Sequence, residues 1–118
     1  MLLTKQKFSA STNGRGIKVV ATVSPGTDIH TAQVGTGDNT YDEIWIWAVN
    51  MDSVARALTI QWGGTTAPDD SIQLTLAAVS GLILVVPGLI LQNSLVVKAF
   101  AAAANVVICH GHVNKVSP

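Results

Sequence analysis

The chain has 118 residues, of which 48% are hydrophobic and only 12% are charged. That length suits one domain of ordinary size, which needs no metal or disulfide to fold. Average soluble domains carry about 25% charged residues, so the low charge predicts that part of the surface contacts protein rather than water. A single cysteine, Cys109, excludes an intrachain disulfide. Its apolar neighbours predict a buried, unreactive thiol.

Charge divides the chain into two parts. Residues 1–18 hold four of the seven basic residues and no acid, whereas residues 19–118 hold three basic and seven acidic residues, a formal charge of −4. We therefore expect residues 1–16 to form an N-terminal arm and residues 17–118 to form one domain. The arm residues expected to contact an acidic neighbouring chain are Lys5, Lys7, Phe8 and Arg15. We expect the arm to be dispensable for folding but needed for attachment or for contact with a neighbouring subunit. A frayed, solvated terminus is the simpler alternative.

Short apolar segments separated by turn signals follow one another along the domain. They recur about every ten residues without helical periodicity, which predicts an all-β fold, an antiparallel sandwich or barrel. The predicted strands, eight or nine in number, are 16–24, 27–34, 42–50, 56–62, 71–79, 81–86, 89–91, 94–100 and 105–113.

The segment "DEIWIWAVN" (42–50) is apolar on both faces if it is a strand. We expect it to form a hairpin with 56–62, in which Asn50 opposes Arg56. Ile44, Ile46 and Ala48 then line the core. The opposite face, which mixes large rings with polar groups as interfaces do, would carry Trp45, Trp47, Thr59 and Gln61. A slip of one residue would instead turn the tryptophans inward.

No catalytic or cofactor-binding residues emerge from the sequence, and we predict that the protein is not an enzyme. His110 and His112 have a spacing that binds metals, and His30 is a possible third ligand. However, the downstream ligands of cupin-type metal sites are missing, so we predict no metal. Cys109 and His110 are adjacent in a predicted strand and point to opposite faces. A cupin-like metalloenzyme stays open as an alternative.

Nucleic acid and membrane are not expected partners. The sequence shows no basic patch interleaved with aromatic residues. The longest apolar run, "GLILVVPGLIL", is too short to span a bilayer and contains a proline. The N-terminus lacks an apolar core of signal-peptide length, so we expect synthesis in a cytoplasm.

Two long segments carry a family resemblance. They are "DEIWIWAVNMDSVARALTIQWGGTTAPDDSIQLTL" and "VPGLILQNSLVVKAFAAAANVVICHGHVNKV". Their shared pattern is a strand ending in an "N-x-(D/S)" turn, a strand ending in "W-G-G", and a late closing hairpin. In this pattern, over roughly residues 17–116, the chain resembles small capsid decoration (cement) proteins of tailed bacteriophages.

This resemblance implies a jelly-roll-like β-sandwich that binds the outer surface of the phage head. The implied partners are the major capsid protein and other copies of the chain, commonly in a homotrimer, and the implied location is the virion. Head–tail and baseplate proteins use similar sandwiches. A carbohydrate-binding module, with Trp45, Trp47 or Trp62 as a stacking platform, is a further alternative.

Overall fold

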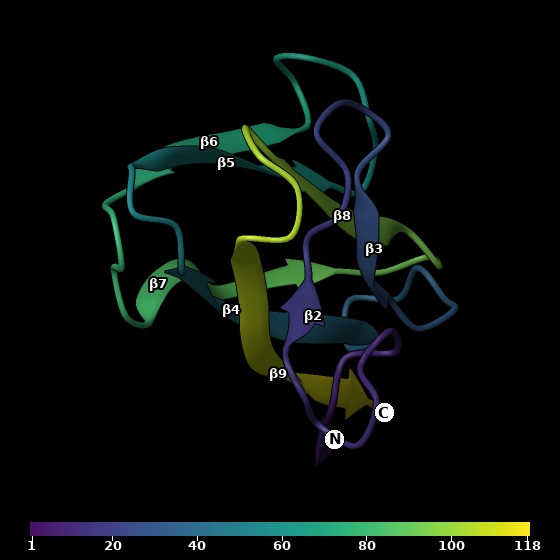
Figure 1. Cartoon of the computed structure of the whole chain (residues 1–118). Coiled ribbons are helices and arrows are strands. Elements are labelled where there is room, and N and C mark those ends of the chain that lie inside the picture. Colours follow the sequence, from purple (N-terminus) through teal and green to yellow (C-terminus); the bar gives the residue numbers. More distant parts are fainter.

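The computed structural model describes residues 1–118, which form two antiparallel β-sheets packed face to face (Figure 1). Sheet A contains β1 (Leu2–Gln6), β2 (Ile17–Lys18), β4 (Tyr41–Asn50), β7 (Ile83–Leu91) and β9 (Val107–Ser117). Sheet B contains β3 (Thr27–Thr31), β5 (Arg56–Trp62), β6 (Ser71–Leu76) and β8 (Val96–Ala101). The predicted all-β sandwich of eight or nine strands is confirmed. No helix is long and apolar enough to cross a membrane.

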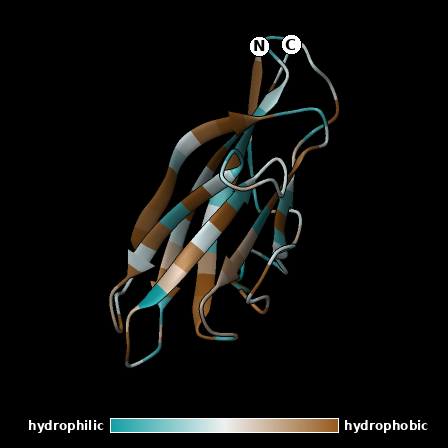
Figure 2. Cartoon of the chain, turned by 90° about the horizontal axis from the view of Figure 1, so that it is seen from above, coloured by the Kyte–Doolittle hydropathy of each residue, from teal (hydrophilic) through white to brown (hydrophobic).

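The strand pairing is nested. β2 pairs with β9, β3 with β8, β4 with β7, and β5 with β6, all antiparallel. This is the pattern of one long hairpin that has been wrapped into two sheets, as in a jelly roll. β1 extends sheet A by pairing with the C-terminal half of β9. As a result both chain ends lie at the same end of the molecule (Figure 2).

The core lies between the sheets and contains 19 buried hydrophobic residues. Alternate residues of each strand supply it, because successive side chains point to opposite faces. On β4 the inward residues are Ile44, Ile46 and Ala48, all fully buried. Cys109 is also fully buried, and this burial raises the pKa of its thiol to about 12.

Several strands differ from those expected. The predicted strand 16–24 is reduced to the two residues of β2, and the predicted strand 105–113 becomes β9, which starts and ends later. The predicted strands 81–86 and 89–91 are a single strand, β7, with Pro87 and Gly88 inside it. β7 is an edge strand, where a proline that lacks an N–H removes no ladder hydrogen bond. The register with β4 also shifts beside Trp45 and beside Trp47, which accommodates the interruption as bulges.

The N-terminal segment is part of the sandwich. β1, which we did not expect as a strand, pairs with β9 from Leu2↔Ser117 to Gln6↔Val113. Phe8 is only 2% exposed and belongs to the hydrophobic core. Packing therefore continues across residue 16, the expected boundary between arm and domain.

Candidate interaction face

The expected hairpin between residues 42–50 and 56–62 is not formed. β4 lies in sheet A between β9 and β7, whereas β5 lies in sheet B between β8 and β6. The link 51–55 crosses from one sheet to the other, a gap of about 10 Å that five residues span easily. The orientation of β4 is nevertheless as expected. Ile44 and Ile46 face the core, while Trp45 and Trp47 face outward and are half-buried.

This crossing also separates the four predicted interface residues. Thr59 and Gln61 lie on β5 in sheet B and are only 5% and 2% exposed. The Gln61 amide accepts a hydrogen bond from the Gly26 N–H at 2.8 Å and donates one to Ser24 Oγ at 2.8 Å. A segment of the same chain thus covers Gln61, and only the two tryptophans remain on a common outward face.

His112 of β9 completes an aromatic cluster with these tryptophans on the outward face of sheet A. The ring centroids of Trp45 and Trp47 are 6.1 Å apart with an interplanar angle of 19°. The His112 ring lies 6.4 Å from Trp45 and 5.9 Å from Trp47, at angles of 15° and 28°. Gly88, with a φ of +78°, allows the Trp45 ring to lie close to β7, because a Cβ there would lie 2.7 Å from the ring.

Hydrogen bonds hold one carboxylate beside the cluster. Glu43 Oε1 accepts from Trp45 Nε1 at 2.8 Å and from Asn114 Nδ2 at 3.0 Å. These two bonds lower the pKa of Glu43, so the group is ionised at neutral pH. Burial lowers the pKa of His112 and nearby Lys5 lowers it further, against a smaller opposing effect of Glu43. His112 is therefore favoured as a neutral ring that packs against the tryptophans.

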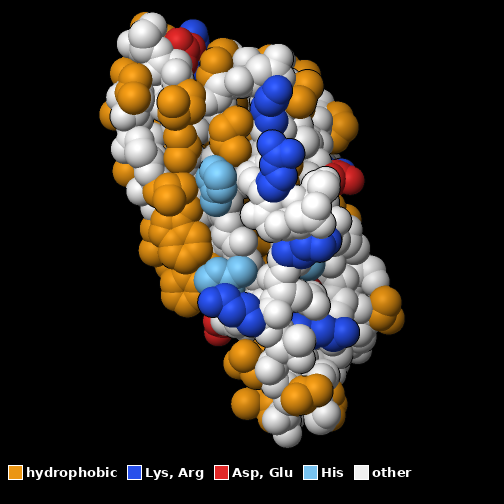
Figure 3. All heavy atoms as spheres, turned by 60° about the horizontal axis from the view of Figure 1, so that its bottom comes forward, with side chains coloured by type: hydrophobic (Ala, Val, Ile, Leu, Met, Phe, Trp, Pro, Cys, Tyr) orange, Lys and Arg blue, Asp and Glu red, His pale blue; other side chains and the backbone are white.

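Apolar side chains of β7 continue the cluster toward the edge of the sheet. The register places Leu84 beside Trp47, Pro87 beside Trp45, and Ile90 beside Glu43. Leu84 is 43% exposed and Ile90 is 57% exposed. Figure 3 shows a band of hydrophobic side chains along one side of the molecule. We call this band the apolar stripe, composed of Trp45, Trp47, Leu84, Pro87 and Ile90.

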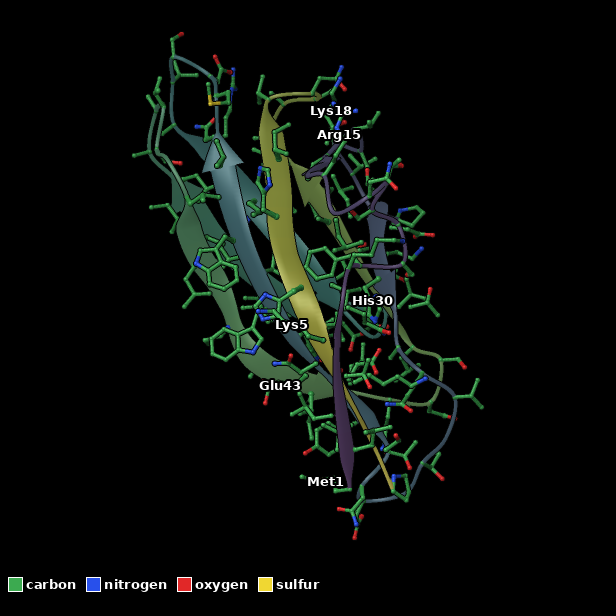
Figure 4. The ribbon with its side chains drawn as sticks, turned by 90° about the horizontal axis from the view of Figure 1, so that it is seen from below. Met1, Lys5, Arg15, Lys18, His30 and Glu43 are labelled. Atoms are coloured by element: carbon green, nitrogen blue, oxygen red, sulfur yellow. The ribbon has the colours of Figure 1, made fainter.

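The predicted arm residues have different positions. Phe8, expected to contact a neighbouring chain, packs in the core of its own chain, near His30 and Gly111. Lys5 and Arg15 are exposed (Figure 4). Lys7 is exposed but donates a hydrogen bond from Nζ to the Ser11 carbonyl at 3.1 Å.

A polar pocket of about 390 Å³ lies where the N-terminal segment meets β3 and β4. Its floor is a buried hydrogen bond, in which His30 Nε2 donates to Asp42 Oδ2 at 2.6 Å. His30 Nδ1 accepts from the Ser9 N–H at 3.0 Å, so both ring nitrogens are occupied. His30 therefore has no free nitrogen for a metal or for base catalysis, and its role is to tie the N-terminal segment to β4. The sequence carried no signal for these two contacts of His30, because Asp42 is 12 residues away and Ser9 is 21 residues away.

The candidate metal-binding histidines lie in separate places. His110 and His112 lie on the outward side of β9, whereas His30 is buried against Asp42, so the three histidines do not converge. No three His, Cys, Asp or Glu side chains are grouped as metal ligands. Comparisons with protein-family models, curated proteins and solved structures found no match.

Proposed function

We propose that the protein is a viral structural protein that decorates the outer surface of a bacteriophage head. It would bind across neighbouring copies of the major capsid protein and would itself assemble as a homotrimer. Its action would be mechanical, because additional buried area at the seams between capsid subunits raises the resistance of the shell to internal pressure. The residue pattern that resembles phage decoration proteins supports this proposal.

The apolar stripe is the observation that carries it. Large exposed apolar patches on a small soluble domain mark interaction sites, and tryptophan is enriched among the residues that dominate binding energy. Trp45 and Trp47 lie side by side on the central strand of sheet A, and Leu84 and Ile90 extend the contact surface to the edge. A protein whose function is surface contact needs such a stripe and no reaction centre.

The test is co-sedimentation of the purified chain with phage heads that lack it. Trp45→Lys/Trp47→Lys should abolish detectable attachment, since each buried interface tryptophan contributes about 2 kcal/mol or more, roughly 30-fold in affinity. Gln73→Lys/Thr75→Lys, on exposed positions of sheet B, changes the charge equally and should bind normally. Leu84→Lys/Ile90→Lys provides a second variant at more exposed positions. Normal attachment of both stripe variants would refute the proposal.

Two measurements separate related roles. Light scattering of the isolated chain should give three times 12.3 kDa, and a monomer would contradict the homotrimer. Cryo-electron microscopy of the virion would locate the protein on the head surface. If the protein instead lies at the head–tail junction, in the tail or in the baseplate, where its copy number would be lower, it is a structural protein of that part and not a decoration protein.

A carbohydrate-binding module is the second candidate, favoured by one observation. The rings of Trp45, Trp47 and His112 are nearly parallel and within about 6 Å of one another, and clusters of aromatic side chains often line sugar-binding sites. Trp62 lies in sheet B and is not part of this cluster. Binding on a glycan array that is lost in Trp45→Lys/Trp47→Lys would favour this function over decoration.

A further inference from the structure

The basic residues of the chain fall into two groups. Arg56 and Lys98 each form an ion pair with an aspartate, Asp52 and Asp28 respectively. The other five form no ion pair and come from the two ends of the chain: Lys5, Lys7, Arg15, Lys18 and Lys115. The fold brings them together because β1 and β2 both pair with β9.

Three of these unpaired cations lie on the outward side of sheet A. Lys5 stands in register with Asn114 and, across β9, with Glu43. Lys18 stands in register with Ile108. Together with Arg15 and His110, Lys18 also lines a hollow of about 530 Å³. We call Lys5, Arg15 and Lys18 the basic strip. Figure 3 shows lysine and arginine side chains in a column alongside the hydrophobic band, with histidines between them.

The face therefore has two parallel halves, one apolar and one positively charged. Figure 4 shows Arg15 and Lys18 next to each other and Lys5 nearer to Glu43. Glu43 forms no ion pair with any residue of the basic strip, and its Oε1 accepts hydrogen bonds from Trp45 and Asn114 instead. Three exposed cations beside an apolar stripe match a partner surface that carries the opposite charge.

We infer that this face docks on an acidic protein surface of a different chain, which places carboxylates opposite the basic strip and apolar side chains opposite the stripe. The inference rests on the proposed function, in which that chain is the major capsid protein. A second copy is a poor occupant, because a two-fold contact presents the same patch from both sides and so offers no acidic surface opposite the basic strip. Trimer contacts must then use another surface or pair this face with a different one.

Single-stranded nucleic acid would also attract cations and aromatic rings, but the geometry disfavours it. Bases stack on aromatic faces that are free. Here the rings of Trp45, Trp47 and His112 pack against one another, and Trp45 also packs against Gly88. Exposed aliphatic side chains such as Leu84 and Ile90 match a protein surface better than a sugar–phosphate chain.

The experiment compares two charge variants with the same change in net charge. Lys5→Gln/Lys18→Gln removes two cations from the basic strip, and Gln73→Glu/Thr75→Glu adds two anions at exposed positions of sheet B. Each labelled protein is titrated against phage heads that lack it, against a synthetic peptide of alternating glutamate and leucine, and against oligothymidylate. Circular dichroism checks that both variants are folded.

We expect Lys5→Gln/Lys18→Gln to bind heads and peptide about 2- to 30-fold more weakly, as expected for the loss of two exposed ion pairs. Binding of the unsubstituted chain should weaken as the salt concentration rises. The sheet B variant should bind as tightly as the unsubstituted chain and show the same salt dependence. Equal binding by the strip variant, or binding to heads and peptide that does not respond to salt, would overturn the inference. Tighter binding to oligothymidylate than to the peptide would also overturn it.

The two proposals fail in different ways. If the unsubstituted chain does not bind heads but binds the peptide, and loses that binding in the strip variant, recognition of an acidic surface stands and the capsid role falls. If the chain binds heads, loses this binding in Trp45→Lys/Trp47→Lys and keeps it in Lys5→Gln/Lys18→Gln, the capsid role stands and the inference of an acidic partner is wrong.

Discussion

Replacing Phe8 with alanine tests whether the N-terminal segment is part of the folded domain. The ring is 2% exposed, its centroid lies 6.1 Å from that of His30, and its Cζ lies 2.7 Å from the position a Cβ on Gly111 would take. Removing a buried phenylalanine side chain costs about 3–5 kcal/mol, because the apolar contacts are lost and a cavity remains. A domain of this length has a total stability of about 6–18 kcal/mol, so the variant should fold but be clearly weakened.

The assay is thermal unfolding followed by circular dichroism. The expected loss corresponds to a decrease in melting temperature of about 10–20 °C for a domain of this size. Leu3→Ala is the matched control, because Leu3 is 56% exposed on β1 and its truncation should change stability by no more than about 0.5 kcal/mol. A loss below about 1 kcal/mol for Phe8→Ala would refute the reasoning. So would a chain lacking residues 1–16 that is as stable as the full chain, as expected for a dispensable arm.

Three other changes test single contacts. Gly111→Ala should leave little soluble folded protein in expression trials, because its Cβ would lie 2.0 Å from the Trp45 carbonyl oxygen at a φ of +152°. The lowered pKa of His112 means that the unfolded chain binds more protons below about pH 6.5, so this stabilising contribution is present above that pH and is lost as the pH falls. His112→Gln should therefore reduce the decrease in melting temperature between pH 7 and pH 5, and an unchanged pH profile would contradict this assignment. Cys109 should resist a thiol reagent in the native protein and react rapidly in denaturant, since it is buried and its thiol pKa is raised to about 12; rapid native labelling would contradict its burial.

Strand positions and the faces of β4 could be predicted because they depend on local alternation. Ile44 and Trp45 are neighbours that must point to opposite sides of any sheet, whichever strands flank it. The pairing partners could not be predicted in this way. A link of five residues, 51–55, serves equally well as a hairpin loop or as a crossing between two sheets, and nothing in its composition distinguishes the two. The interface assignment of Thr59 and Gln61 depended on the hairpin and was lost with it.

The interaction face was only partly visible in the sequence for the same reason. Trp45 and Trp47 are two residues apart and were found together. His112 and Lys18 are remote in sequence from them, and they reach the same face only because β9 pairs with both β4 and β2. The role of Phe8 was misjudged because a single apolar residue in a basic segment gives no periodic signal. Its burial depends on Gly111, 103 residues further along the chain.

The nested pairing of strands also determines how the chain can fold. Only β5 and β6 are neighbours both in sequence and in a sheet, so only that hairpin can form early from local contacts. β9, the last of the nine strands to be synthesised, lies inside sheet A between β4 and the two N-terminal strands. Topologies dominated by distant pairings fold slowly, on the order of milliseconds to seconds, because loop closure must precede their contacts. On the ribosome, sheet A therefore cannot close until β9 has emerged, and the apolar residues of β4 and β7 stay exposed to other chains until then.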